Sequence, residues 1–305
     1  MNLFRPREIN SFAYVLDDGR SMIFDGFWSG FQPAKDYGFW VDLLPRFCDK
    51  QTIRVLGPFW HRHNRKQLES MRDELGRWDF FITGENRDNC TDLSEKCIGF
   101  RLPQTAGEIR FPYWQWYLTW EGYETAPPYE RFGERLSIDN LMRPINAVFD
   151  PPSRDEFEQT QPKAVLMTSH FKRHRRRLWR MADKAMGCDA FGRKVRPTEL
   201  SKKELLMAYP FNLCPENRED EGYITEKIPE AFLCGCIPLT YCHPDDLARD
   251  FNPAAVINLY GLSKRQAIAR LREAATDYEM FQALRSEPLV LKRPSITPLL
   301  DFLSL

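Results

Sequence analysis

The segment YPFNLCPENREDEGYITEKIPEAFLCGCIPLTYC, residues 209–242, alternates apolar runs with polar and amphipathic stretches. The run PFNLC at 210–214 is typical of a buried strand and leads into a polar loop. After the loop, apolar residues recur every three or four positions from Ile228 to Gly235, which predicts a helix, and CIPLTYC at 236–242 predicts the next strand. A strand, a helix and a second strand in this order favour an α/β fold with parallel sheets.

The same alternation continues through the rest of the chain. Nine segments are predicted strands: 21–28, 52–59, 79–85, 97–102, 163–169, 188–192, 210–216, 236–242 and 255–259. The predicted helices include 64–77, 175–186 and 263–284. Paired prolines and acidic residues in FDPPSRDEFEQTQPK, at 149–163, indicate a linker. We therefore expect two Rossmann-like domains, residues 1–155 and 156–305, with a central cleft between them at the carboxyl ends of the strands.

The charge balance argues against a general polyanion-binding protein. The chain carries 43 basic and 43 acidic side chains, although SHFKRHRRRLWR at 169–180 concentrates positive charge in one segment. Proteins that are held to nucleic acid by phosphate contacts usually carry a positive excess over the whole domain. A non-enzymatic role in polyanion or nucleic-acid binding through residues 172–180 is therefore the weaker alternative.

The sequence predicts no membrane span, disulfide framework or metal cluster. Its first 20 residues lack an apolar signal region, and no run approaches the roughly 18 apolar residues of a membrane helix. The eight cysteines are scattered or lie in apolar runs such as LCGCIPLTYCH at 233–243, which is typical of reduced thiols that act as small hydrophobic residues. We therefore expect a cytoplasmic protein. Neither G-x-G-x-x-G nor G-x-x-x-x-G-K-[ST] occurs, so a dinucleotide oxidoreductase or a P-loop nucleotidase is not supported.

The helix after the polar loop is predicted to begin close to Thr225 or Glu226, because Pro229 fits only the first turn of a helix. Glu226 and Lys227 then lie at a helix N-terminus that faces the expected cleft. Free backbone N–H groups there favour an anion, and Lys227 adds a full positive charge. Glu226 would accept hydrogen bonds from ligand hydroxyls. The simpler alternative is that Thr225 and Glu226 only cap the helix.

The passage FNLCPEN…GYITEKIPEAFLCGCIPL resembles the donor-binding signature of the bacterial α-1,3/1,4-fucosyltransferases of glycosyltransferase family 10. Further segments that resemble this family are FDGFW at 24–28, FFITGENRDNCTDLSEKCIGF at 80–100, IRFPYW at 109–114 and ARDFNPAAVIN at 248–258. The resemblance covers most of residues 20–260. It implies a GT-B-like fold, with an N-terminal domain that binds the acceptor and a C-terminal domain that binds the donor.

The resemblance also implies the reaction and the partners. The donor would be GDP-β-L-fucose, and L-fucose would move with inversion to a GlcNAc residue of a lactosamine-type glycan, such as a lipopolysaccharide O-antigen. Nucleic acid would not be a partner, and the protein would be cytoplasmic, associated peripherally with the inner face of the membrane. A transferase of the same family with a different donor or acceptor is the alternative enzyme.

Among the site residues, the resemblance assigns the acceptor base to Glu85 of the T-G-E-N motif. Glu216 and Glu226 are the competing carboxylates, but both lie in the donor-side motif. Glu226 and Lys227 of the T-E-K triplet would contact the donor and assist catalysis. The tyrosine that contacts the donor would be Tyr223, and a second contact would come from the amide of Asn217.

The remaining part of the resemblance concerns the diphosphate. KAVLMTSHFKRHRRRLWRMADKAMGCDAFGR, at 163–193, is similar to the family's strand and basic helix start, in which an arginine contacts the diphosphate. Counting back from CDAFG gives Arg175, which we prefer, and counting forward from TSH gives Arg176. His170 stands where the family usually has asparagine. No D-x-D motif occurs, so we expect no metal ion and no cofactor, with the leaving diphosphate stabilised by arginine and lysine.

Overall fold

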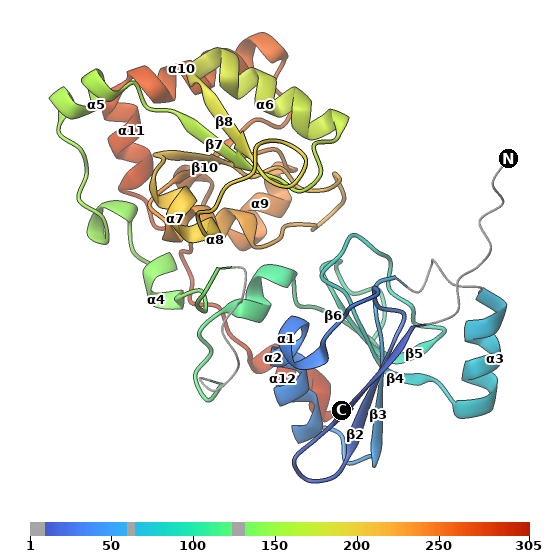
Figure 1. Cartoon of the computed structure of the whole chain (residues 1–305). Helices are drawn as coiled ribbons and strands as arrows, with labels where there is room; N and C mark the ends of the chain where they lie inside the picture. The colour runs from blue at the N-terminus through green and yellow to red at the C-terminus, as the bar shows by residue number, and fades with distance from the viewer. Residues whose placement is uncertain (1–9, 60–64, 124–131) are drawn as a thin grey trace, which may run out of the picture. The chain divides into compact units, whose positions relative to one another are not determined.

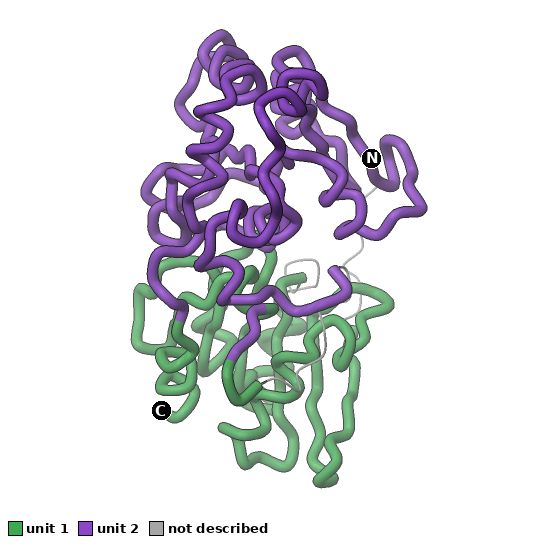
Figure 2. Tube along the Cα trace, turned by 90° about the vertical axis from the view of Figure 1, so that its left-hand side faces the viewer, with its two compact units in different colours: residues 1–117, 121–127, 295–305 green, residues 118–120, 128–294 purple. Residues whose placement is uncertain are grey.

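The computed structural model describes residues 10–59, 65–123 and 132–305. The chain forms two compact units, which are coloured separately in Figure 2. Unit 1 comprises Met1–Tyr117, Glu121–Pro127 and Ser295–Leu305, and unit 2 comprises Leu118–Trp120 and Pro128–Pro294. Each unit is built on one sheet of mainly or wholly parallel strands, so the predicted α/β fold with two parallel sheets is confirmed.

Unit 1 contains a six-stranded sheet in sequential order (Figure 1). Its strands are β1 (Ser11–Val15), β2 (Ser21–Asp25), β3 (Thr52–Leu56), β4 (Trp78–Ile82), β5 (Ser94–Gly99) and β6 (Glu108–Arg110). β1 is antiparallel to β2 and the other neighbours are parallel, with Trp78 of β4 opposite Ser94 of β5. Every residue of β4 is buried, as expected for a central strand that is covered on both faces. The helices of this unit are α1 (Pro33–Asp36), α2 (Gly38–Leu43), α3 (Arg65–Leu75) and α12 (Thr297–Ser304).

Unit 2 contains a five-stranded parallel sheet in the order β11-β10-β9-β7-β8. Its strands are β7 (Ala164–Met167), β8 (Cys188–Phe191), β9 (Phe211–Leu213), β10 (Ile237–Thr240) and β11 (Ile257–Asn258). Figure 1 shows α6 (Arg173–Met186) and α10 (Lys264–Thr276) on one side of this sheet and α7 (Lys202–Met207), α8 (Lys227–Leu233) and α9 (Pro244–Asp250) on the other. The remaining helices are α4 (Ile138–Leu141), α5 (Arg154–Thr160) and α11 (Tyr278–Arg285). Helices on both faces explain why the strands of this sheet read as continuous apolar runs.

The nine predicted strands each overlap an observed strand, but two further strands were missed. β1 is an edge strand without a buried residue, and β6 has only three residues. The predicted helix 263–284 is broken at Asp277, whose side chain accepts a hydrogen bond from the backbone N–H of Met280 (3.1 Å) and so caps α11.

The prediction of a linker at 149–163 is wrong for residues 154–160, which form α5. Ser153 and Glu156 form a capping box that starts α5, and Phe157 is buried with its ring 4.8 Å from that of Phe281. The compact units also divide the chain elsewhere than near residue 155. Residues 295–305 belong to unit 1, because α12 buries three apolar side chains there and Lys96 Nζ donates to the carbonyl of Leu303 (2.7 Å).

Candidate functional site

The strand order of unit 2 creates a switch point between β7 and β9. The chain runs from β7 outward to β8 and then returns to β9 on the other side of β7. In open parallel sheets ligands bind outside the carboxyl ends of the strands at such a point, because the connections diverge there and leave a crevice. The segments that follow β7 and β9 carry all the site residues predicted for this half of the chain.

Arg175 joins these two segments. It lies in the first turn of α6, is only 7% exposed, and donates from Nη1 to Oγ1 of Thr168 (2.8 Å) and from Nη2 to Oδ1 of Asn217 (2.5 Å). Arg176, by contrast, is exposed and lies over the ring of Phe171, 5.4 Å from its centroid. The structure therefore brings Arg175, and not Arg176, next to Asn217.

A glycine permits the close packing that holds Thr168 in place. Gly192 follows β8 with φ of 134°, and a Cβ atom at this position would lie 2.1 Å from the carbonyl oxygen of Thr168. A side chain at Gly192 would therefore displace the end of β7, and with it the partner of Arg175.

Lys227 is the centre of a buried polar network after β9. Its Nζ donates to Oε2 of Glu216 (2.7 Å) and Oγ1 of Thr225 (2.6 Å) and lies 3.7 Å from Oε1 of Glu226. The backbone N–H of Thr225 also donates to Glu216 (2.8 Å). Burial opposes the charge of Lys227, but Glu216 and Glu226 together raise the pKa of this lysine well above its usual value. The lysine therefore stays charged at every physiological pH.

Glu226 occupies the N-cap position of α8, which begins at Lys227, and its side chain makes no capping hydrogen bond. The alternative that Thr225 and Glu226 only cap the helix is therefore wrong, since the hydroxyl of Thr225 binds Glu216 instead. Burial by itself would raise the pKa of Glu226, but the charges of Lys227 and Lys202 lower it to about 2. The carboxylate is thus ionised and available as a hydrogen-bond acceptor.

The lowered pKa of Glu226 predicts a loss of stability in acid. A carboxyl group whose pKa falls from 4.5 to about 2 on folding contributes fully above pH 4.5, and the contribution disappears as the pH falls towards 2. The full effect is about 3 kcal/mol, at 1.36 kcal/mol for each pKa unit. Urea unfolding between pH 7 and pH 3 should therefore show a shallower acid slope for Glu226→Gln than for Glu199→Gln, an exposed control; equal slopes would contradict the assignment.

A second ion pair lies behind this network and was not predicted. Lys202 of α7 pairs with Glu230 of α8, which is completely buried. Burial raises the pKa of Glu230 to about 7, although the charge of Lys202 opposes this shift. The partners are 28 residues apart in the chain, so no local pattern could have indicated the pair.

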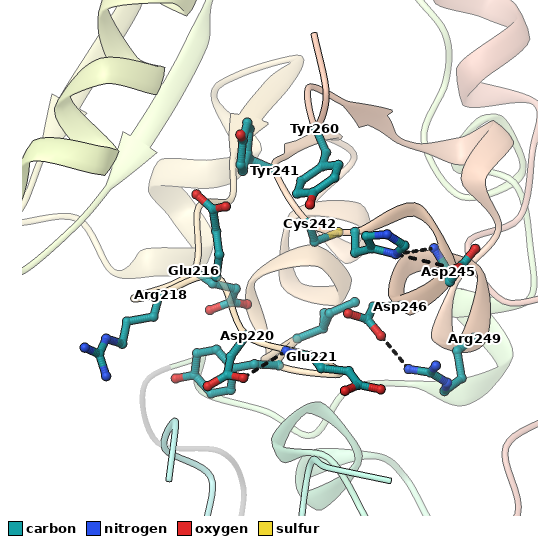
Figure 3. Close-up of a pocket in the computed structure, with 14 residues that line it drawn as sticks. Glu216, Arg218, Asp220, Glu221, Tyr241, Cys242, Asp245, Asp246, Arg249 and Tyr260 are labelled. Atoms are coloured by element: carbon teal, nitrogen blue, oxygen red, sulfur yellow. Dashed lines mark hydrogen bonds and ion pairs between the residues drawn. The ribbon is translucent and has the colours of Figure 1, made fainter. Parts of the chain in front are cut away.

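A cavity of about 440 Å³ opens beside the network (Figure 3). Glu216 and Tyr223 contribute to its lining from the loop after β9, and Tyr241 and Tyr260 follow β10 and β11. The rings of these last two tyrosines lie 5.3 Å apart, and Figure 3 shows them at one end of the cavity. The remaining lining residues are Arg218, Glu219, Asp220, Glu221, Ile224, Cys242, His243, Asp245, Asp246 and Arg249. Aromatic faces beside carboxylates suit a planar ring that also carries hydroxyl or amide donors.

Glu85, the predicted base, belongs to unit 1. It is exposed in the bend after β4, where its backbone N–H donates to Oγ1 of Thr83 (3.1 Å). Burial raises the pKa of Tyr37 well above its usual value, and interactions with Tyr117 and with the charge of Glu85 raise it further. The carboxylate therefore lies at the carboxyl end of a central strand, as the sequence predicted.

The aromatic-rich segment RFPYWQWYLTWEGY at 110–123 divides into core and surface. Trp114, Trp116 and Trp120 are buried and belong to the core. Tyr113 and Tyr117 are partly exposed, and their hydroxyl groups are 2.8 Å apart. Partly exposed tyrosine rings of this kind could contact a sugar.

Two absences hold for the described residues. No helix in those segments has both the length and the apolar composition that are needed to span a bilayer. Within the same residues, no three His, Cys, Asp or Glu side chains come together as a potential metal site.

Comparison with known proteins shows what unit 2 is similar to. Residues 157–285 match the family model described as "Glycosyltransferase family 10 (fucosyltransferase) C-term". Over 198 residues the chain is 27% identical to the "Alpha-(1,3)-fucosyltransferase FucT" of Helicobacter pylori. This alignment covers 59% of the chain and 40% of the relative, so the chain spans about two fifths of that relative's length.

Solved structures agree in fold. A crystal structure of an α1,3-fucosyltransferase is similar with a TM-score of 0.63 and 20% sequence identity, over 90% of this chain and 86% of the other. A structure of an α1,3-fucosyltransferase with GDP-fucose has a TM-score of 0.61 and 19% identity, over the same shares of both chains. The matched segment contains the whole network of Arg175, Asn217 and Lys227. Through residues 157–285, the chain is similar to the C-terminal part of glycosyltransferase family 10.

Proposed function

We propose that the protein is an inverting fucosyltransferase, which transfers L-fucose from GDP-β-L-fucose to a GlcNAc residue of a lactosamine-type glycan. The observation that carries this proposal is a pair of cations, the buried Arg175 and the partly buried Lys227, beside the switch point of a domain similar to family 10. The printed names of the relatives, an α-(1,3)-fucosyltransferase and a structure with GDP-fucose, support the donor and the reaction class.

In this proposal unit 2 binds the donor. The guanidinium of Arg175 and the ammonium of Lys227 provide two fixed positive charges for the diphosphate, and their burial makes each charge act more strongly than it would in water. Glu226 accepts hydrogen bonds from hydroxyl groups of the sugar, and the amide of Asn217 and the ring of Tyr223 complete the contacts. The cavity lined by Tyr241 and Tyr260 takes the nucleoside.

Unit 1 supplies the base. Glu85 takes the proton from the acceptor hydroxyl while the hydroxyl oxygen attacks C1 of fucose on the face opposite to GDP. The bond between C1 and the diphosphate oxygen breaks, and its electrons leave with GDP. One displacement of this kind inverts the anomeric centre from β to α. The leaving charge is stabilised by Arg175 and Lys227.

The choice between the two arginines can be tested directly. Arg175→Ala should weaken GDP binding about 100-fold, because a buried guanidinium that pairs with a ligand anion is lost. Arg176→Ala, one position away on the same helix, should change the affinity by less than about twofold, since its side chain is exposed. Calorimetric titration of both variants with GDP gives the comparison, and the opposite order would assign the diphosphate to Arg176.

The proposed donor class is tested by titrating the wild-type protein with GDP, UDP and ADP. We expect GDP to bind best. A panel of GDP-sugars, each incubated with lactosamine-type acceptors, then distinguishes fucose from other donors. Transfer of another sugar in preference to fucose would establish the alternative family transferase, and absence of nucleotide binding would contradict both.

A further inference from the structure

The outer side of α6 carries a stripe of cations that the proposed reaction does not use. Five exposed basic side chains form it: Arg173, Arg176, Arg177, Arg180 and Lys184. The other four residues follow Arg173 by three, four, seven and eleven positions. In a helix with 3.6 residues per turn, this spacing places all five on one side. The opposite side of the helix is buried and consists of Arg175, Leu178, Met181 and Ala182. The stripe, defined by these five residues, is about 16 Å long at 1.5 Å per residue.

No carboxylate neutralises the stripe. Within the described segments none of its five side chains forms an ion pair, and the nearest pair in sequence joins His174 to Glu219 (3.4 Å). The one acidic residue of α6, Asp183, instead accepts a hydrogen bond from the backbone N–H of Cys188 (3.3 Å). Five like charges on one helix face repel one another, and binding to a negative surface would relieve this repulsion.

The neighbouring helix adds to the charge. α10 packs against α6 on the same side of the sheet (Figure 1) and exposes Lys264, Arg265 and Arg272. Leu262, an apolar side chain just before α10 begins, is 37% exposed. Basic residues next to an exposed aliphatic group are a combination that binds the interfacial region of an anionic membrane.

We propose that the α6 stripe docks the protein on a membrane surface rich in anionic lipid headgroups. A planar surface needs cations on one face only, and five exposed cations lie on one face of α6 although the formal net charge of the chain is zero. A nucleic acid that wraps a protein would usually require a positive excess over the whole domain. The docking does not depend on the proposed fucosyl transfer, since Arg175 points to the opposite side of α6.

Vesicle sedimentation tests the proposal with the whole chain. Wild-type protein should sediment with phosphatidylcholine vesicles that contain phosphatidylglycerol, should not sediment with pure phosphatidylcholine, and should be released by high salt. The variant R173Q/R180Q/K184Q should lose about 100-fold in partitioning, because each basic residue near the surface contributes about 1 kcal/mol, or roughly fivefold. The matched control K203Q/K292Q/R293Q removes the same charge from cations outside α6 and α10 and should bind as the wild type does; Lys203 is partly exposed, and Lys292 and Arg293 are exposed.

The results separate the alternatives. Absence of binding to the anionic vesicles, or equal loss in the two triple variants, would overturn the proposal. Tighter binding to duplex DNA than to anionic vesicles would also overturn it and identify a nucleic-acid surface. Thermal melting checks that both variants fold, and transfer to a soluble acceptor should be unchanged in each. If wild-type protein transfers no sugar, the proposed function fails while the vesicle result still decides the docking.

Discussion

Replacement of Lys227 with alanine should weaken GDP binding about 1000-fold and reduce fucosyl transfer below detection. Truncating one partner of a buried, hydrogen-bonded charge pair costs about 2–5 kcal/mol. In the alanine variant, the diphosphate would lose its contact with the ammonium group of Lys227. The variant also leaves the carboxylates of Glu216 and Glu226 without their common cation. Stability should therefore fall by about 3 kcal/mol or more.

Because Lys227→Ala destabilises the protein, Lys227→Arg serves as a second variant that keeps the charge. It should retain the fold and a measurable part of the GDP affinity. Lys203→Ala is the matched control, since Lys203 forms a partly exposed pair with Glu134 at 2.8 Å, and it should alter neither property by much. Calorimetry with GDP and urea unfolding give both quantities. Undiminished GDP affinity in folded Lys227→Ala would remove this lysine from the donor site.

Replacement of Glu85 with glutamine should reduce the transfer rate about 1000-fold and leave GDP binding unchanged. A positioned general base contributes roughly 10²–10⁴-fold, and the amide of glutamine cannot accept the proton. Glu85 belongs to unit 1, whereas Arg175 and Lys227, which would hold the diphosphate, belong to unit 2, so donor affinity should not respond. Asp88→Asn, an exposed acid in the same loop, is the matched control.

The two measurements have to be made on the same Glu85 variant. Single-turnover transfer reports the chemical step, and GDP titration reports the donor site. A collapse of GDP affinity would make Glu85 a donor-site residue, and full transfer activity would exclude it as the base. In either case Glu216 and Glu226 would return as the candidate carboxylates.

The fold and the start of α8 were predictable because their signals are local. Pro229 limited the start of α8 to within one or two residues, and the observed helix begins at Lys227. The apolar runs that became β7, β9 and β10 are buried on both faces, so their composition is distinctive. Arg175 lies in the first turn of α6, close to the start of the predicted helix 175–186, and the preference for Arg175 over Arg176 came from the family resemblance.

Other features were missed because they depend on contacts between distant segments. Glu216 was treated only as a competing base, and its role as the direct partner of Lys227 required the loop after β9 to fold back on α8. Composition gave a wrong prediction at residues 154–160, where a linker was expected. This acidic segment forms a helix because one capping box and one buried ring stabilise it. The C-terminal residues 295–305 joined unit 1 through α12, a long-range return that no local pattern records.

The most direct test of the proposed function is the anomeric configuration of the product. The protein is incubated with GDP-β-L-fucose and N-acetyllactosamine, and the product is examined by proton NMR. We expect an α-L-fucoside on the GlcNAc residue together with one equivalent of released GDP. A β-fucoside, or no transfer to any lactosamine-type acceptor by protein that binds GDP, would contradict the proposal.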